Sequence, residues 1–126
     1  MKLAFVYAGQ GSQFAGMGKD LYEAYPAARA VFDNFPADFD LKTVCFEDPD
    51  GVIGRTRYTQ PCMLAMAMAI TDILAEQGVR PEMAAGLSLG EYGALYAAGV
   101  FDQHTAAELI GFRGRAMEQA SEGVES

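Results

Sequence analysis

The sequence has little of what metal sites, redox sites and nucleic-acid interfaces usually require. Its 126 residues include one histidine and two cysteines, Cys45 and Cys62, which is too few for a usual zinc set. Both cysteines have apolar neighbours, so we expect buried free thiols in a reducing cytosol. The nine Lys and Arg are scattered among seventeen Asp and Glu. This excludes the clustered basic surface that binds nucleic acid or phospholipid.

Long hydrophobic runs are absent as well. No stretch of about 18 uninterrupted apolar residues occurs, so we expect no membrane span. The apolar run after Lys2 is shorter than a signal-peptide core, and no small-residue cleavage site follows it. With 51% apolar and 21% charged residues, the composition is typical of a soluble globular protein of one domain. We expect a cytoplasmic location.

The hydrophobic pattern predicts strands and helices in alternation. We expect strands at 3–7 and 82–85, a helix that begins at Lys19, a second from Pro26 to about Asn34, and further helices at 61–77, about 91–98 and about 103–120. Residues 35–58 are rich in Asp, Pro and Gly and predict a surface connection with one short helical turn. This order indicates an α/β layered fold with a parallel sheet. Because two strands are few for such a sheet and the sequence ends in a polar stretch, we interpret residues 1–126 as the N-terminal portion of a larger domain.

One pentapeptide has the spacing of a catalytic turn. Gly86-Leu87-Ser88-Leu89-Gly90 fits the Gly-x-Ser-x-Gly nucleophile elbow, in which a tight strand-to-helix turn exposes the serine oxygen. Glycine two residues before and after the serine relieves crowding in that turn. The alternative is a glycine-rich turn in which Ser88 merely caps the following helix.

The loop Gly9-Gln10-Gly11-Ser12-Gln13 follows the first predicted strand. A dinucleotide fingerprint requires glycine where Phe14 stands, and a P-loop requires Ser or Thr where Asp20 stands. Two interpretations remain open: a loop whose backbone amides face an anion, or an ordinary strand-to-helix turn.

Arg113 lies on an apolar helical stripe with Ala106, Leu109, Ile110 and Met117. An arginine in such a place needs an anion, because an unpaired buried charge is costly. That anion is either an internal Asp or Glu, or a substrate carboxylate held by the planar guanidinium. Arg115 falls on the opposite face with Glu108 and Glu118, as a solvated residue would.

Taken together, these residues resemble the malonyl-CoA:acyl-carrier-protein transacylase family along the whole chain. The Gly-Gln-Gly-Ser-Gln loop at residues 9–13 and Thr59-Gln60-Pro61 match two family motifs. The elbow at residues 86–90 and Arg113-Gly114 with Met117 match two more. The resemblance implies an α/β-hydrolase-like core, incomplete here because the family's ferredoxin-like subdomain and C-terminal part lie beyond residue 126.

The resemblance also implies roles for individual residues. Ser88 would carry the malonyl group as an ester, and the backbone N–H groups of Gln10 and Leu89 would form the oxyanion hole. Arg113 would bind the malonyl carboxylate. Malonyl-CoA and acyl carrier protein are the implied partners, in fatty acid biosynthesis, and no metal or other cofactor is implied.

Some positions depart from the family pattern. Ala8 replaces a frequent proline, and Leu87 replaces a histidine often found before the nucleophile. The family's catalytic histidine has no counterpart in residues 1–126, and we expect His104 to be an exposed helix residue. The resemblance therefore predicts negligible activity for these residues alone, with the C-terminal portion as a further partner if it forms a separate chain.

Three alternative functions remain. The first is an acyltransferase of polyketide assembly, and the second is a non-catalytic fragment that binds carrier protein. The third is a serine hydrolase, which Arg113 and the Gly-Gln-Gly-Ser-Gln loop both disfavour.

Overall fold

The computed structural model describes residues 2–122, which form two strands and six helices within that range. In chain order these are β1 (Ala4–Tyr7), α1 (Lys19–Ala24), α2 (Pro26–Asn34), α3 (Leu41–Phe46), α4 (Thr56–Glu76), β2 (Met83–Gly86), α5 (Gly90–Ala97) and α6 (Gln103–Ser121). The predicted α/β class and the order of elements are confirmed.

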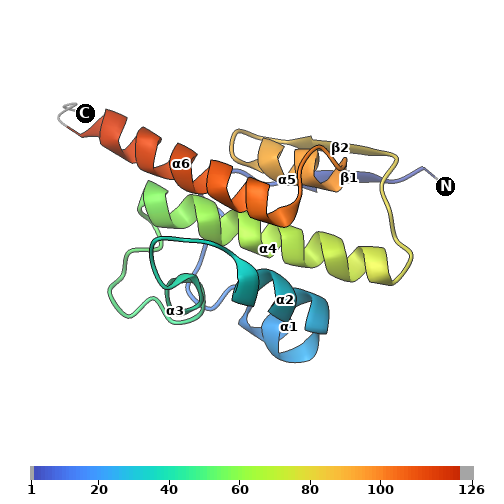
Figure 1. Ribbon diagram of the computed structural model, residues 1–126, viewed down its shortest axis with the longest axis horizontal. Helices are drawn as coiled ribbons and strands as arrows, with labels where there is room; N and C mark the ends of the chain where they lie inside the picture. The colour runs from blue at the N-terminus through green and yellow to red at the C-terminus, as the bar shows by residue number, and fades with distance from the viewer. Residues whose placement is uncertain (1, 123–126) are drawn as a thin grey trace.

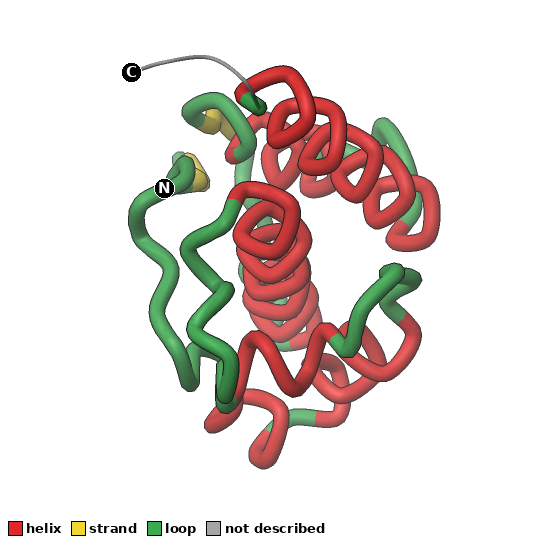
Figure 2. The backbone as a smooth tube through the Cα atoms, turned by 90° about the vertical axis from the view of Figure 1, so that its left-hand side faces the viewer, coloured by secondary structure: helices red, strands yellow, loops and turns green. Residues whose placement is uncertain are grey.

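The helix α4 runs through the middle of the molecule, with α1, α2 and α3 on one side and α5, α6 and the strands on the other (Figure 1). Figure 2 looks along α4 and shows the other helices and the loops gathered around it. An apolar surface on all sides explains this central place. Leu64, Ala65, Met68 and Ala69 of α4 are each no more than 1% exposed.

The two strands pair in parallel, with Ala4 opposite Met83 and Tyr7 opposite Gly86. Both strands therefore end at the same edge, where the first loop and the elbow begin. The side chains of one sheet face are half-buried, whereas those of the other face are exposed. Val6, on the exposed face, is 81% exposed. An apolar run such as Leu3 to Tyr7 predicts a buried strand, but β1 is half-buried on one face and exposed on the other.

The start of α4 corrects the sequence prediction. The helix was expected to begin at Pro61, because proline favours the first turn, but it begins at Thr56 and contains Pro61 in its interior. The missing proline N–H removes one helix hydrogen bond. Side-chain contacts hold the extra turn: the Thr59 hydroxyl donates to the carbonyls of Arg55 and Ile53, and the Gln10 amide donates to the Thr56 hydroxyl at 3.2 Å.

The segment 35–58 contains the predicted short helical turn, but it is more than a surface connection. It contains α3, whose N-cap Asp40 accepts from the Thr43 N–H at 3.1 Å. Leu41, Cys45 and Ile53 are buried, so the segment contributes to the core rather than covering it as a surface connection. Charged and turn-forming residues around these apolar positions hide the pattern in the sequence.

Cys45 and Cys62 are free and fully buried, as predicted. The Cys45 thiol donates to the Met17 carbonyl at 3.2 Å. The hydrogen bond with Cys45 and burial both raise the pKa of the Cys62 thiol. Within residues 2–122 no group of three or more His, Cys, Asp or Glu could hold a metal ion, and no helix is long and apolar enough to cross a membrane.

Candidate active site

Ser88 lies on a strained turn between β2 and α5. Its φ is 55°, a left-handed conformation that costs a non-glycine residue free energy. A Cβ on Gly86 would lie 2.0 Å from the carbonyl oxygen of Gly90, so the turn closes only with glycine at position 86. The Ser88 side chain is exposed. This is the local geometry that a nucleophile elbow requires.

The tip of β1 packs directly against this turn. A Cβ on Gly90 would lie 2.4 Å from the Tyr7 carbonyl oxygen, and one on Gly9 would lie 2.8 Å from the Leu87 carbonyl oxygen. The Leu87 N–H donates to the Tyr7 carbonyl at 3.2 Å. The glycines therefore let two backbone segments approach closely, and the first loop and the elbow form one surface.

The backbone N–H groups of Gln10 and Leu89 on this surface have no acceptor among residues 2–122, and neither do those of Gly9 and Ser88 beside them. Gln10 is exposed, whereas the Leu89 side chain is buried and anchors the turn. The next amide in the loop is occupied, because the Gly11 N–H donates to the Gln13 side chain at 2.7 Å. Backbone donors left free beside a nucleophile suit a developing oxyanion.

Arg113 of α6 reaches the same place. Its Nη2 donates to the Ser88 hydroxyl oxygen at 3.0 Å, and its Nη1 donates to the Gln60 amide oxygen at 2.8 Å. The guanidinium carbon lies 5.6 Å from the centre of the Tyr92 ring. Arg113 forms no ion pair with any carboxylate of the described residues. Within that range, the internal salt bridge considered from the sequence is not found.

The expected apolar stripe around Arg113 is only partly buried. Ala106 and Ile110 are fully buried against the core, but Leu109 and Met117 are each 43% exposed. Arg113 itself is half-buried. Its guanidinium is therefore held by protein groups while one side remains open to solvent.

Gln60 is the site residue that the sequence did not single out. It belongs to the Thr59-Gln60-Pro61 motif, from which no role was predicted for it, yet its side chain is fully buried and contacts Arg113 across 53 positions of sequence. A glutamine that begins an otherwise apolar run is the signal that could have revealed it, because buried amides need partners. Tyr92, whose ring contacts the guanidinium, is a second site residue for which no role was predicted from the sequence.

His104 and Arg115 lie where the sequence placed them. The His104 side chain is 66% exposed, and its Nε2 lies 2.8 Å from a Glu108 carboxylate oxygen one turn along α6. Arg115 is exposed and lies 3.7 Å from the Asp38 carboxylate. Neither side chain contacts Ser88. Within residues 2–122, no histidine or carboxylate is hydrogen-bonded to the Ser88 hydroxyl.

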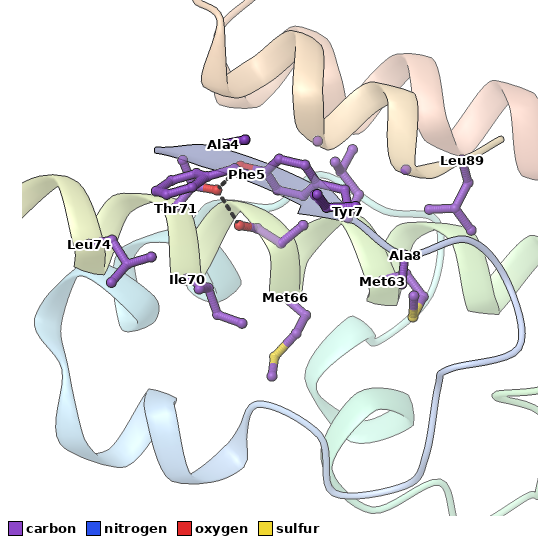
Figure 3. A pocket seen from close by; sticks show the side chains of 15 residues that line it. Ala4, Phe5, Tyr7, Ala8, Met63, Met66, Ile70, Thr71, Leu74 and Leu89 are labelled. Atoms are coloured by element: carbon purple, nitrogen blue, oxygen red, sulfur yellow. Dashed lines mark hydrogen bonds between the residues drawn. The ribbon is translucent and has the colours of Figure 1, made fainter. Parts of the chain in front are cut away.

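A cavity lies between β1 and α4 and extends to Leu89 and Gly90 of the elbow, which form part of its wall (Figure 3). It measures about 360 Å³, and its walls include Phe5, Met66, Ile70 and Leu74. Its polar contact is the hydrogen bond between the Tyr7 and Thr71 hydroxyls at 2.7 Å. Burial raises the pKa of the Tyr7 phenol, so this hydroxyl stays neutral. The cavity lacks the acid–base groups of a reaction site, and the chemistry-bearing residues gather instead at the elbow.

Comparison with known proteins gives consistent results. A family model described as an acyl transferase domain matches residues 4–125. The malonyl CoA-acyl carrier protein transacylase of Bacillus subtilis (strain 168) is 40% identical over 121 residues, which are 94% of this chain and 38% of that protein. The polyketide synthase GfsB of Streptomyces halstedii is 39% identical, and the match covers 98% of this chain but 2% of the synthase.

The solved structures show the same likeness. The crystal structure of a malonyl CoA-acyl carrier protein transacylase from Clostridium perfringens superposes with a TM-score of 0.90 at 36% identity. The match covers 99% of this chain and 39% of that one. This chain therefore spans about two fifths of the length of the transacylases that it matches.

Proposed function

Because the chain belongs to the acyl transferase family, we propose that it contributes the nucleophile and the carboxylate-binding residue of a malonyl-CoA:acyl-carrier-protein transacylase. The names of its relatives support this substrate and this carrier. The observation that carries the proposal is the 3.0 Å contact between the Arg113 guanidinium and the Ser88 hydroxyl. A fixed cation beside an exposed nucleophile suits an acyl group that ends in a carboxylate.

In the proposed reaction, the Ser88 oxygen attacks the thioester carbonyl of malonyl-CoA. The C–S bond breaks, CoA leaves as the thiol with the serine proton, and malonate remains on Ser88 as an ester. The phosphopantetheine thiol of acyl carrier protein then attacks this ester and restores the serine. Each step passes through an oxyanion, which the Gln10 and Leu89 N–H groups would stabilise. The step requires no metal or redox cofactor.

A serine hydroxyl is a weak nucleophile without an adjacent base. The proposal assigns that base to a histidine outside residues 1–126, because His104 is exposed and paired with Glu108. Loss of such a partner lowers the rate by about 10⁴- to 10⁶-fold. Residues 1–126 alone should therefore transfer negligible malonate unless the C-terminal portion is supplied, for example as a separate chain.

Intact-mass measurement tests the proposal. The acyltransferase polypeptide that contains residues 1–126 is incubated with malonyl-CoA, and a malonyl adduct should appear that is absent from Ser88→Ala. Addition of holo acyl carrier protein should remove the adduct and leave malonate on the carrier. An adduct that persists in Ser88→Ala would overturn the assignment of the nucleophile.

An acyltransferase of polyketide assembly is the second candidate, favoured by the 39% identity to the synthase GfsB. It would use the same serine and arginine, so the two functions differ in the carrier that accepts the acyl group. Parallel assays with a fatty-acid carrier and a polyketide carrier would separate them. If the carrier binds while neither it nor Ser88 is acylated, the chain is a non-catalytic binding fragment.

A further inference from the structure

Gln60 joins α4 to α6 because the two ends of its side-chain amide contact Arg113 and Met117. The amide oxygen accepts from Arg113 Nη1 at 2.8 Å, and Nε2 donates to Met117 Sδ at 3.2 Å. Arg113 and Met117 are one helical turn apart on α6. The Gln60 side chain is fully buried, so these two contacts replace the hydrogen bonds that its amide would make with water.

The orientation of this amide follows from its partners. Guanidinium nitrogens only donate hydrogen bonds, and a thioether sulfur only accepts them. If the Gln60 amide were reversed, its NH2 group would face the N–H donors of Arg113. Its oxygen would then face the Met117 sulfur, which has no proton to donate. Gln60 therefore presents an acceptor to Arg113, and its conformation is fixed by both contacts.

Each contact of the Arg113 guanidinium within residues 2–122 is with an uncharged group: the Gln60 amide, the Ser88 hydroxyl and the Tyr92 ring. A carboxylate at position 60 would also orient the guanidinium, but it would cancel its charge. An amide orients the arginine and leaves the full positive charge available to a ligand.

We propose that Gln60 is a positioning residue that holds Arg113 without neutralising it, and that it thereby determines the preference for carboxylated over uncharged acyl groups. The inference rests on the proposed function, because it assigns Arg113 to the acyl carboxylate. It adds that the charge at position 60, and not only the presence of Arg113, controls selectivity.

The competing explanation is that Gln60 only joins the two helices. Gln60→Glu and Gln60→Met separate these explanations, since both keep the side-chain length. The glutamate variant keeps an acceptor for Arg113 and adds a negative charge. The methionine variant fills the same space but removes the acceptor. Gln119→Glu, an exposed residue of α6, is the matched control for the change in net charge.

The experiment measures acylation of the complete acyltransferase polypeptide by malonyl-CoA and by acetyl-CoA, as kcat/KM for each donor. Gln60→Glu should lower the malonyl-to-acetyl ratio by about 10- to 100-fold, the effect of losing one charge-assisted hydrogen bond, while acetyl transfer is retained. Gln60→Met should lower the same ratio less, through a higher KM for malonyl-CoA. Gln119→Glu should match the wild type.

A structural role for Gln60 would give a different result. Transfer of both donors would fall together in Gln60→Glu, or the ratio would stay unchanged in both variants, and either outcome overturns the inference. Thermal unfolding of each variant shows whether it is folded. If Gln60→Glu does not fold, the malonyl-to-acetyl ratio of Gln60→Met still tests the inference. A wild type that forms no Ser88 adduct would instead refute the proposed function.

Discussion

The backbone conformation of Ser88 exposes its side chain but lowers the stability of the fold. Its φ of 55° places the side chain at the tip of the turn, but this conformation costs an L-residue about 1–2 kcal/mol. Glycine adopts it without that penalty. The proposed nucleophile therefore stands at a position where glycine would make the fold more stable, as is common for strained functional sites.

We predict that Ser88→Gly is more stable than Ser88→Ala by about 1 kcal/mol, because both lose the Arg113 contact and only glycine relieves the backbone. Urea unfolding of the two variants measures this difference. Both should fail to form an acyl adduct. Equal stabilities would mean that the turn relaxes in solution and that Ser88 is not held as the structure describes.

Several residues around Ser88 could be predicted from the sequence, whereas the contact between Gln60 and Arg113 could not. The glycines at positions 86 and 90 mark the elbow through their local spacing, although only the collision at Gly86 involves a neighbour in sequence, whereas a Cβ on Gly90 would meet the Tyr7 carbonyl of β1. Gln60 meets Arg113 only after α4 and α6 pack together. A glutamine in an apolar run indicates a buried amide that needs a partner, but no local pattern identifies Arg113 as that partner, so the sequence predicted the arginine and not the amide that holds it.

The limits of some helices could be predicted from the sequence, whereas the start of α4 could not. The predicted limits of α2, α5 and α6 agree with the structure to within about a residue, in keeping with the usual uncertainty at helix ends. The N-cap of α6 is Asp102, whose side chain accepts from the Thr105 N–H at 2.8 Å. The first turn of α4 was missed because α6 and the first loop hold it: a Cβ on Gly114 of α6 would lie 3.3 Å from the Thr56 carbonyl oxygen.

A polar network fixes α5 and α6 to α4. The Tyr96 hydroxyl and the Gln103 amide each donate to a different Asp72 carboxylate oxygen at 2.6 Å. Burial, followed by the hydrogen bond to Asp72, raises the pKa of Tyr96 to about 12 from its ordinary 10.0. The folded state therefore keeps the phenol proton at a pH where the unfolded chain loses it.

The sign of the pH effect follows. The contribution of Tyr96 to the free energy of unfolding is complete below pH 10 and is lost as the pH rises toward about 12. Tyr96→Phe should be less stable than the wild type at neutral pH, and the difference should narrow above pH 10. Urea unfolding across that range measures it, with Tyr25→Phe as a control outside the network. A constant difference would contradict the assignment.

Within residues 2–122, the two faces of the sheet differ in burial, and the sequence does not indicate this difference. Residues of β1 are apolar on both faces, which is typical of parallel strands covered on both sides. The structure covers one face only, and Val6 and Met83 on the other are 81% and 64% exposed. Leu87 and Phe112 add further exposed apolar surface at 75% and 68%. Val6 and Met83 lie on neighbouring strands and on the same exposed face of the sheet, so together they offer apolar surface to water.

We therefore expect residues 1–126 by themselves to bind the apolar dye 8-anilinonaphthalene-1-sulfonate. A double variant, Val6→Thr with Met83→Thr, should bind less dye, because threonine keeps the strand preference but adds a hydroxyl. Its free energy of unfolding should stay nearly unchanged, since both side chains already contact water. Dye fluorescence and urea unfolding, measured together, separate the two effects. Unchanged fluorescence would locate the apolar surface at Leu87 and Phe112, beside the elbow, rather than on the sheet.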